Sequence, residues 1–121
     1  MENILKEKSM DFAIRIVKLY KYLNDKKIYS LSDQILRSGT AIGVLQREAE
    51  HAESKADFIH KYSIAQKECN ETLYWLELLY KSEYISESEF NSIYQDANEL
   101  MKLITCSIKT VKYGKSSSVH C

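Results

Sequence analysis

The stretch from Ser54 to Lys81 constrains the fold most, because apolar residues recur along it at helical spacing without a break. At about 100° per residue, these residues gather on one side of a long amphipathic helix. Ser54, with Asp57 three residues later, is typical of a helix N-terminus. The residues that share the core-facing side are Phe58, Tyr62, Ala65, Cys69, Thr72, Leu73, Leu76, Leu79 and Tyr80.

A second apolar set lies on a different side of the same helix. It comprises Ile64, Trp75 and Leu78, around Glu68 and Glu71. Contiguous apolar patches outside a core usually mark contact with another molecule, and tryptophan is common at the centre of interfaces. The alternative is that a wide apolar stripe wraps into one monomeric core.

Two helices are expected before this stretch. The first covers Ile4–Asn24. The second is capped by Ser30 or Ser32, carries Asp33 in its first turn and runs to about Ala52, because serine and acidic residues favour the positive end of a helix.

A fourth helix is opened by Ser86, and Glu89 three residues later completes a capping box. Gly114 is a natural C-terminal stop. With no proline, three glycines and short links, the chain predicts an all-α, antiparallel up-down-up-down four-helix bundle over residues 1–113. Residues 114–121 are expected to form a flexible tail.

The first helix also carries surplus apolar residues. Met10, Ile14 and Val17 lie away from its core-facing stripe. Together with the second set of the third helix, they exceed what one four-helix core can bury. We therefore expect a homo-oligomer whose contact involves Ile64, Trp75, Leu78, Met10, Ile14 and Val17.

The charge balance gives nucleic-acid binding little support. The chain has 17 Lys and Arg against 17 Asp and Glu, whereas phosphate-binding domains usually show a basic excess. Residues 1–27 are mildly basic, with seven Lys and Arg against four Asp and Glu. An alternative function is therefore an accessory nucleic-acid-binding module that uses Lys6, Lys8, Arg15, Lys18 and Lys21, repeated around an oligomer.

Metal or cofactor chemistry is not indicated. Glu48 and His51 have the E-x-x-H spacing of di-iron bundles, but those sites need a second such motif, and the fourth helix has no histidine. The three cysteines are far apart and form no C-x-x-C. We expect no metal, no cofactor and no catalytic residue.

The spacing of Glu68 and Glu71 would suit acid–base chemistry. No histidine, metal set or glycine-rich loop accompanies them. A structural ion pair with Arg37 or Arg47 of the second helix is the favoured interpretation. Such a pair more often determines packing than adds much stability.

Gly39 and Gly43 lie within the second helix, where two glycines cost about 2 kcal/mol relative to alanine. Close approach of another helix would offset that cost; the alternative is a kink or break. The chain contains no G-x-G-x-x-G phosphate loop.

The runs LSDQILRSGTAIG, REAE and KADFIHKYSIAQKECNETLYWLELL resemble a bacterial family of four-helix-bundle proteins. That family was first described from intervening sequences in 23S ribosomal RNA genes and is related to the accessory variability determinant of diversity-generating retroelements. The likeness extends over residues 3–112. The residues that carry it as a set are Gln34, Arg37, Ser38, Ile42, Gly43, Glu48, Ala49, Asp57, Phe58, Glu68, Glu71, Trp75 and Leu76.

The resemblance implies a four-helix protomer in a ring-like homo-oligomer, commonly a pentamer, with no established enzymatic activity. The retroelement relative is strongly basic and binds nucleic acid, whereas this chain is neutral. The expected function is a non-catalytic, self-associating scaffold. No apolar run reaches the ~20 residues of a membrane span, and residues 1–10 lack a signal-peptide core, so a cytoplasmic location without membrane contact is expected.

One departure from the family pattern is at Val44, Leu45 and Gln46, where the family usually has Ala-Asn followed by an apolar residue. Gln46 therefore falls on the core-facing stripe of the second helix. An unpartnered buried amide costs about 1–3 kcal/mol. Three explanations are open: Gln46 has a partner across the bundle, the helix turn is shifted, or the position faces a subunit boundary.

Overall fold

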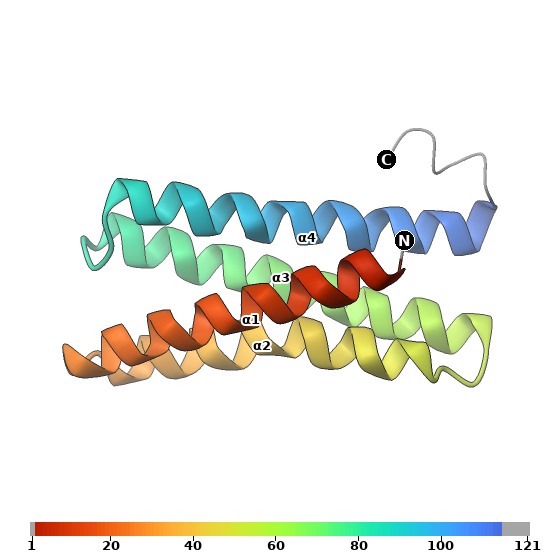
Figure 1. Ribbon diagram of the computed structural model, residues 1–121, viewed down its shortest axis with the longest axis horizontal. Coiled ribbons are helices and arrows are strands. Elements are labelled where there is room, and N and C mark those ends of the chain that lie inside the picture. The colour runs from red at the N-terminus through yellow and green to blue at the C-terminus, as the bar shows by residue number, and fades with distance from the viewer. Residues whose placement is uncertain (1, 115–121) are drawn as a thin grey trace.

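Figure 1 shows the computed structural model, which describes residues 2–114 and the side chains from residue 4. Four helices follow one another: α1 (Glu2–Asp25), α2 (Tyr29–Glu50), α3 (Lys55–Lys81) and α4 (Glu87–Tyr113). Each runs opposite to the one before it (Figure 1). The prediction of an all-α four-helix bundle is confirmed. The expected tail lies outside the described residues except for Gly114.

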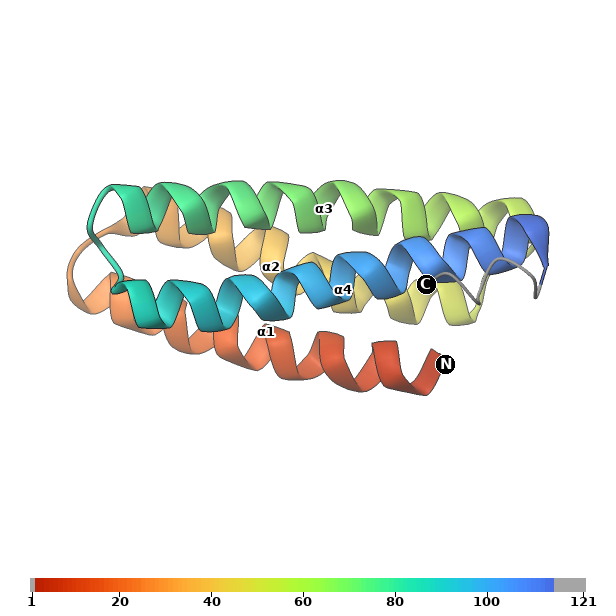
Figure 2. The ribbon, with the colours of Figure 1, turned by 90° about the horizontal axis from the view of Figure 1, so that it is seen from above.

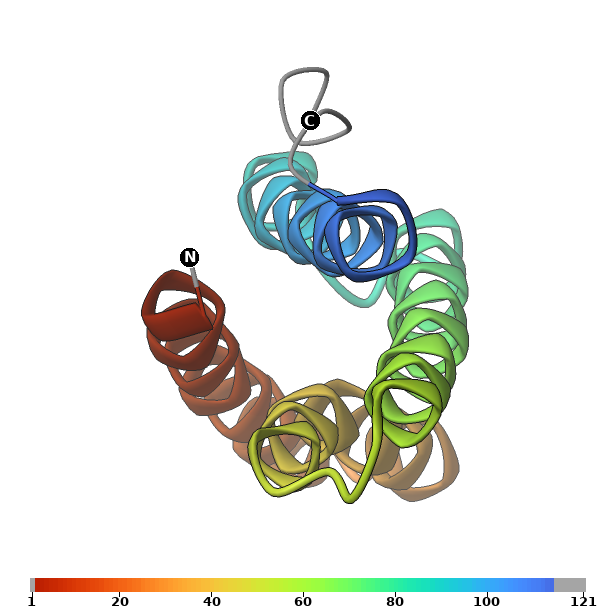
Figure 3. The same cartoon turned by 90° about the vertical axis from the view of Figure 1, so that its right-hand side faces the viewer.

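Helices adjacent in sequence pack side by side, and α1 meets α4 to complete the bundle (Figures 2 and 3). This α1–α4 seam is the least closely packed of the four. Viewed from the end, α1 and α3 lie on opposite sides, with α2 between them (Figure 3). The most deeply buried side chains come from all four helices and include Phe12, Ile16, Ile35, Ile42, Tyr62, Leu76, Leu79, Leu100 and Ile104.

The helix caps explain where α3 and α4 begin and where α4 ends. Ser54 accepts a hydrogen bond from the Asp57 N–H, and Ser86 and Glu89 form a reciprocal capping box. These satisfy N–H groups that the first helical turn leaves free. Gly114, with φ of 86°, caps α4. All three signals were predicted correctly.

The predicted start of α2 is wrong. The helix begins at Tyr29, and neither Ser30 nor Ser32 caps it. Ser32 is buried, and its hydroxyl donates to Asn24 Oδ1 at 2.7 Å, which ties α2 to α1. Because the helix begins earlier than expected, Asp33 falls beyond the first turn. The far end is also earlier, at Glu50.

Gly39 allows α1 to approach α2 closely. A Cβ atom at this position would lie 2.7 Å from Cγ1 of Ile16, whereas one on Gly43 would meet Ser9 at an ordinary 3.6 Å. Helix α2 continues unbroken through both glycines. The predicted close approach is confirmed at Gly39, and the alternative of a break is wrong.

Candidate interaction surfaces

One apolar surface lies on the outside of α1. Met10, Ile14 and Val17 are 45%, 48% and 37% exposed. Their spacing of four and three residues places them on one face of the helix. We call these three residues the outer α1 surface. None of the three belongs to the buried core of the described residues or to the partly buried side chains that pack against it.

A second surface spans α2 and α3. Ile64, Trp75 and Leu78 are half-buried, and Trp75 also packs against the core from its inner edge. Tyr74 is 58% exposed, and its ring meets that of Trp75 edge-on at 5.1 Å. The indole of Trp75 therefore belongs partly to the core and partly to the exposed surface.

Val44 extends the second surface onto α2, where it is 57% exposed. It lies seven residues after Arg37 and four before Glu48. Both of these residues form ion pairs with α3, so Val44 lies on the same side of α2. We call Val44, Ile64, Tyr74, Trp75 and Leu78 the α2–α3 surface. The sequence analysis missed Val44 and Tyr74, although the spacing to Arg37 was available for Val44.

An ion-pair cluster lies within the α2–α3 surface. Nη1 of Arg37 donates to Oε1 of Glu68 at 3.0 Å, and Nη2 pairs with Oε2 of Glu71. The indole Nε1 of Trp75 donates to the same Glu71 oxygen at 3.0 Å. The structure thus brings together Arg37, Glu68 and Glu71 as the sequence indicates, with Arg37 rather than Arg47 as the partner.

These contacts favour the charged form of Glu71. The hydrogen bond from Trp75, followed by the bond and charge of Arg37, lowers the pKa of its carboxyl against the opposing effect of burial. Because the pair is partly exposed, its main consequence is geometric. It holds the Trp75 ring in one orientation on the surface.

The basic residues of α1 are less available than the sequence indicates. Lys6, Lys8 and Arg15 pair with Glu50, Glu99 and Asp96 at 3.3, 3.2 and 2.8 Å. Lys18 and Lys21 are exposed and form no ion pair within the described part of the chain. The proposed nucleic-acid face is thereby reduced to two uncompensated charges per protomer.

The residues weighed for metal binding do not gather. Glu48 forms an ion pair with Lys61 at 3.2 Å, and His51 lies beyond the end of α2. Across residues 2–114, no three His, Cys, Asp or Glu side chains lie close enough to hold a metal ion. Cys69 is buried, which raises the pKa of its thiol to about 12, so it remains protonated and unreactive.

Gln46 is buried on the core side of α2, 2% exposed. Its Nε2 donates weakly to Glu50 on the same helix, at 3.4 Å. Its Oε1 has no hydrogen-bond partner among the described residues. Of the three possibilities raised by the sequence, a partner across the bundle is therefore not found.

These observations define a helical-bundle protein with two apolar surfaces as its main candidate functional features. No helix within residues 2–114 is long and apolar enough to cross a membrane. The family model of the 23S rRNA-intervening sequence protein matches residues 1–106. The chain belongs to that family, which confirms the resemblance seen in the sequence.

A solved structure supports the same assignment. It is the crystal structure of a protein with unknown function from the S23 ribosomal protein family of Bacteroides thetaiotaomicron VPI-5482. The sequence of that protein is 55% identical to this chain. The match has a TM-score of 0.88 and covers 90% of this chain and 98% of that one. A comparison with curated proteins finds no significant match. The family and this relative therefore support the fold and do not assign an activity.

Proposed function

We propose that this protein is a non-catalytic scaffold that self-associates by packing the outer α1 surface of one copy against the α2–α3 surface of the next. The observation that carries the proposal is the exposure of Met10 and Ile14, close to one half, on a face that no described residue covers fully. Burying such side chains contributes about 25 cal/mol per Å² of apolar area.

The charges of the two surfaces support the pairing. Lys18 and Lys21 flank the outer α1 surface beyond Val17, whereas Glu7 and Asp11 flank it near Met10, so the basic end is the one that would face the partner's carboxylates. The α2–α3 surface carries the carboxylates of Glu68 and Glu71 against the single guanidinium of Arg37, which leaves one negative charge. Complementary charge at an interface favours one partner orientation over others.

Two different surfaces that contact each other produce a head-to-tail assembly. Helices α1 and α3 lie on opposite sides of the bundle (Figure 3), so each copy would offer one surface to each of two neighbours. Such heterologous contacts form a closed ring when the rotation between copies closes. The family resemblance leads us to expect a ring of five copies in the bacterial cytoplasm.

Light scattering on the intact chain tests the assembly. We expect a mass roughly five times the 14.1 kDa of one chain. Ile14→Glu and Val44→Glu each place a charge on one exposed surface and should reduce the mass to that of a monomer. Tyr113→Glu, at an apolar position 69% exposed outside both surfaces, is the matched control and should leave the mass unchanged.

Mixing the two variants distinguishes head-to-tail from symmetric contacts. The Ile14→Glu chain keeps an intact α2–α3 surface, and the Val44→Glu chain keeps an intact outer α1 surface. One-to-one heterodimers should therefore form in the mixture but in neither sample alone. A monomeric wild-type protein at micromolar concentration, or a Val44→Glu variant that still dimerises by itself, contradicts the proposal.

A further inference from the structure

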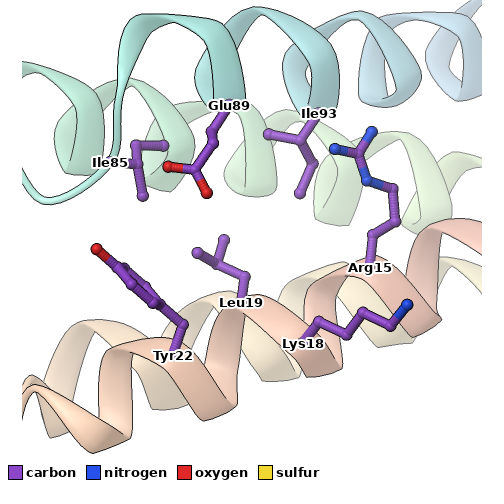
Figure 4. Close-up of a pocket in the computed structure, with 7 residues that line it drawn as sticks. All are labelled: Arg15, Lys18, Leu19, Tyr22, Ile85, Glu89 and Ile93. Carbon is purple, nitrogen blue, oxygen red and sulfur yellow. The ribbon is translucent and has the colours of Figure 1, made fainter.

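A groove between α1 and α4 has an apolar floor. Leu19 of α1, Ile85 of the α3–α4 link and Ile93 of α4 line a space of about 280 Å³ (Figure 4). Ile85 and Ile93 are 6% and 5% exposed, so the more accessible apolar area of the lining comes from the half-buried Leu19 and the exposed Tyr22. The space is near the lower end of small-molecule pockets, which are mostly apolar with a few fixed polar groups.

Cationic groups occupy one end of this groove. Arg15 and Lys18 both lie at this end, where the guanidinium of Arg15 reaches toward α4 and the chain of Lys18 runs along α1 (Figure 4). Arg15 is held in place by Asp96 through Nη1 at 2.8 Å, so its charge is already paired. Lys18 has no ion-pair partner within residues 2–114. This end therefore has one positive charge that is not neutralised.

The opposite end of the groove is acidic, and its carboxylate is held in place by hydrogen bonds. Oε1 of Glu89 accepts hydrogen bonds from the N–H and the hydroxyl of Ser86, at 3.3 and 3.1 Å. Figure 4 shows the carboxylate beside Ile85 and facing the Tyr22 ring across the groove. A negative charge held here disfavours a second one nearby. The groove is thus polarised along its length, with apolar side chains in between.

We propose that this groove binds a small amphipathic monocarboxylate. Its apolar body would cover Leu19, Ile85 and Ile93, and its carboxylate would lie against Lys18. Glu89 would set the orientation and reject molecules with a second carboxylate at the far end. The inference does not rest on self-association, because Leu19, Ile85 and Ile93 lie on the α1–α4 seam and outside both surfaces assigned to subunit contact; Lys18 alone also borders the outer α1 surface.

Methyl-labelled isoleucine and leucine report directly on the floor, even in a large assembly. We expect 3-phenylpropionate, at millimolar concentration, to shift the methyl signals of Leu19, Ile85 and Ile93. The cation 3-phenylpropylamine, of similar size, and the dicarboxylate 3-(4-carboxyphenyl)propionate, whose second carboxylate is at the far end of the ring, should shift them several times less. Ile14 of the outer α1 surface should keep its signal.

Substitution of one lysine identifies the carboxylate site. Lys18→Ala should weaken 3-phenylpropionate binding about fivefold, as expected for loss of one exposed charge pair. Lys21→Ala, the next exposed lysine on α1, should leave the affinity unchanged. Absence of floor shifts, an equal response to the amine, or equal affinity in the Lys18→Ala protein overturns the proposal. The oligomer mass, measured in parallel, separates this outcome from failure of the scaffold model.

Discussion

Gln46 places an amide where helical spacing calls for an apolar side chain, and the structure buries it almost completely. The carbonyl oxygen gains no protein hydrogen bond among the described residues in exchange for the water it loses. Such an acceptor costs about 1–3 kcal/mol. The sequence could show that Gln46 would be buried, but not which of its neighbours would fail to reach it.

We expect Gln46→Met to raise the free energy of unfolding by about 1 kcal/mol, because methionine fills similar space without a buried acceptor. Gln66→Met is the matched control: Nε2 of Gln66 donates to Thr105 at 2.9 Å, so that change should lower stability by about 1 kcal/mol. Urea unfolding at one fixed protein concentration measures both. Loss of stability on Gln46→Met would mean that this amide has a partner.

At the scale of helices, the sequence predicted the elements better than the turns. Ser54, Ser86 and Gly114 are local signals, because each acts on the helix turn beside it. The α1–α2 and α3–α4 turns instead place Lys27 and Glu83 at φ of 63° and 66°. Glycine is the usual residue for that conformation, so a lysine or a glutamate at these positions does not predict it.

Both turns end their helix in the same way. The N–H after the left-handed residue bonds back to a buried leucine carbonyl, Ile28 to Leu23 and Tyr84 to Leu79, each at 2.9 Å. This is the hydrogen-bond pattern of a Schellman cap. Because of this cap, α2 begins only two residues after Lys27. That early start is why Ser32 contacts α1 instead of capping α2.

Contact between α1 and α2 depends differently on the two glycines of α2. Gly39→Ala should lower the free energy of unfolding by about 1–3 kcal/mol, because the new methyl would overlap Ile16, which is fully buried and has no room to move. Gly43→Ala should raise it by about 0.8–1 kcal/mol through helix propensity, since its methyl meets only ordinary contacts.

Thermal or urea unfolding of both variants measures the difference. An Ile16→Ala background supplies the control, because removing the overlapping atoms should abolish the cost of Gly39→Ala. Equal effects of the two alanines would contradict the close approach assigned to Gly39. The glycine spacing alone predicted a near neighbour; only the structure shows that one of the two positions is the tight one.

At the scale of the molecule, the sequence indicated more apolar surface than one bundle buries, and the structure leaves part of it uncovered. Met10, Ile14 and Val17 could be assigned because they lie opposite the core-facing stripe of α1. The division of Trp75 between core and surface could not, since it depends on the distance to α2 and on the bond to Glu71. Helical spacing predicts in which direction a side chain points, but not how closely the neighbouring helix packs against it.

The neighbouring helices of the bundle do not all pack equally closely. Each of α2 and α3 packs closely against a helix on both sides, whereas α1 and α4 share the loosest seam. That seam contains the groove of Figure 4 and two partly exposed ion pairs, Lys8 with Glu99 and Arg15 with Asp96. Exposed pairs contribute about 0–1 kcal/mol each. Opening of α1 from α4 should therefore cost less than separation of α2 from α3.

Amide hydrogen exchange tests this order. We expect the slowest exchange in the middle of α2 and α3 and exchange at least tenfold faster in the matching turns of α1 and α4, because local opening follows packing density. The Ile14→Glu protein is the sample of choice, since assembly would otherwise protect α1 from outside. Equal protection of all four helices would show that the protomer opens only as one cooperative unit. Slower exchange of α1 in the wild-type chain than in the variant would, in turn, locate the subunit contact on α1.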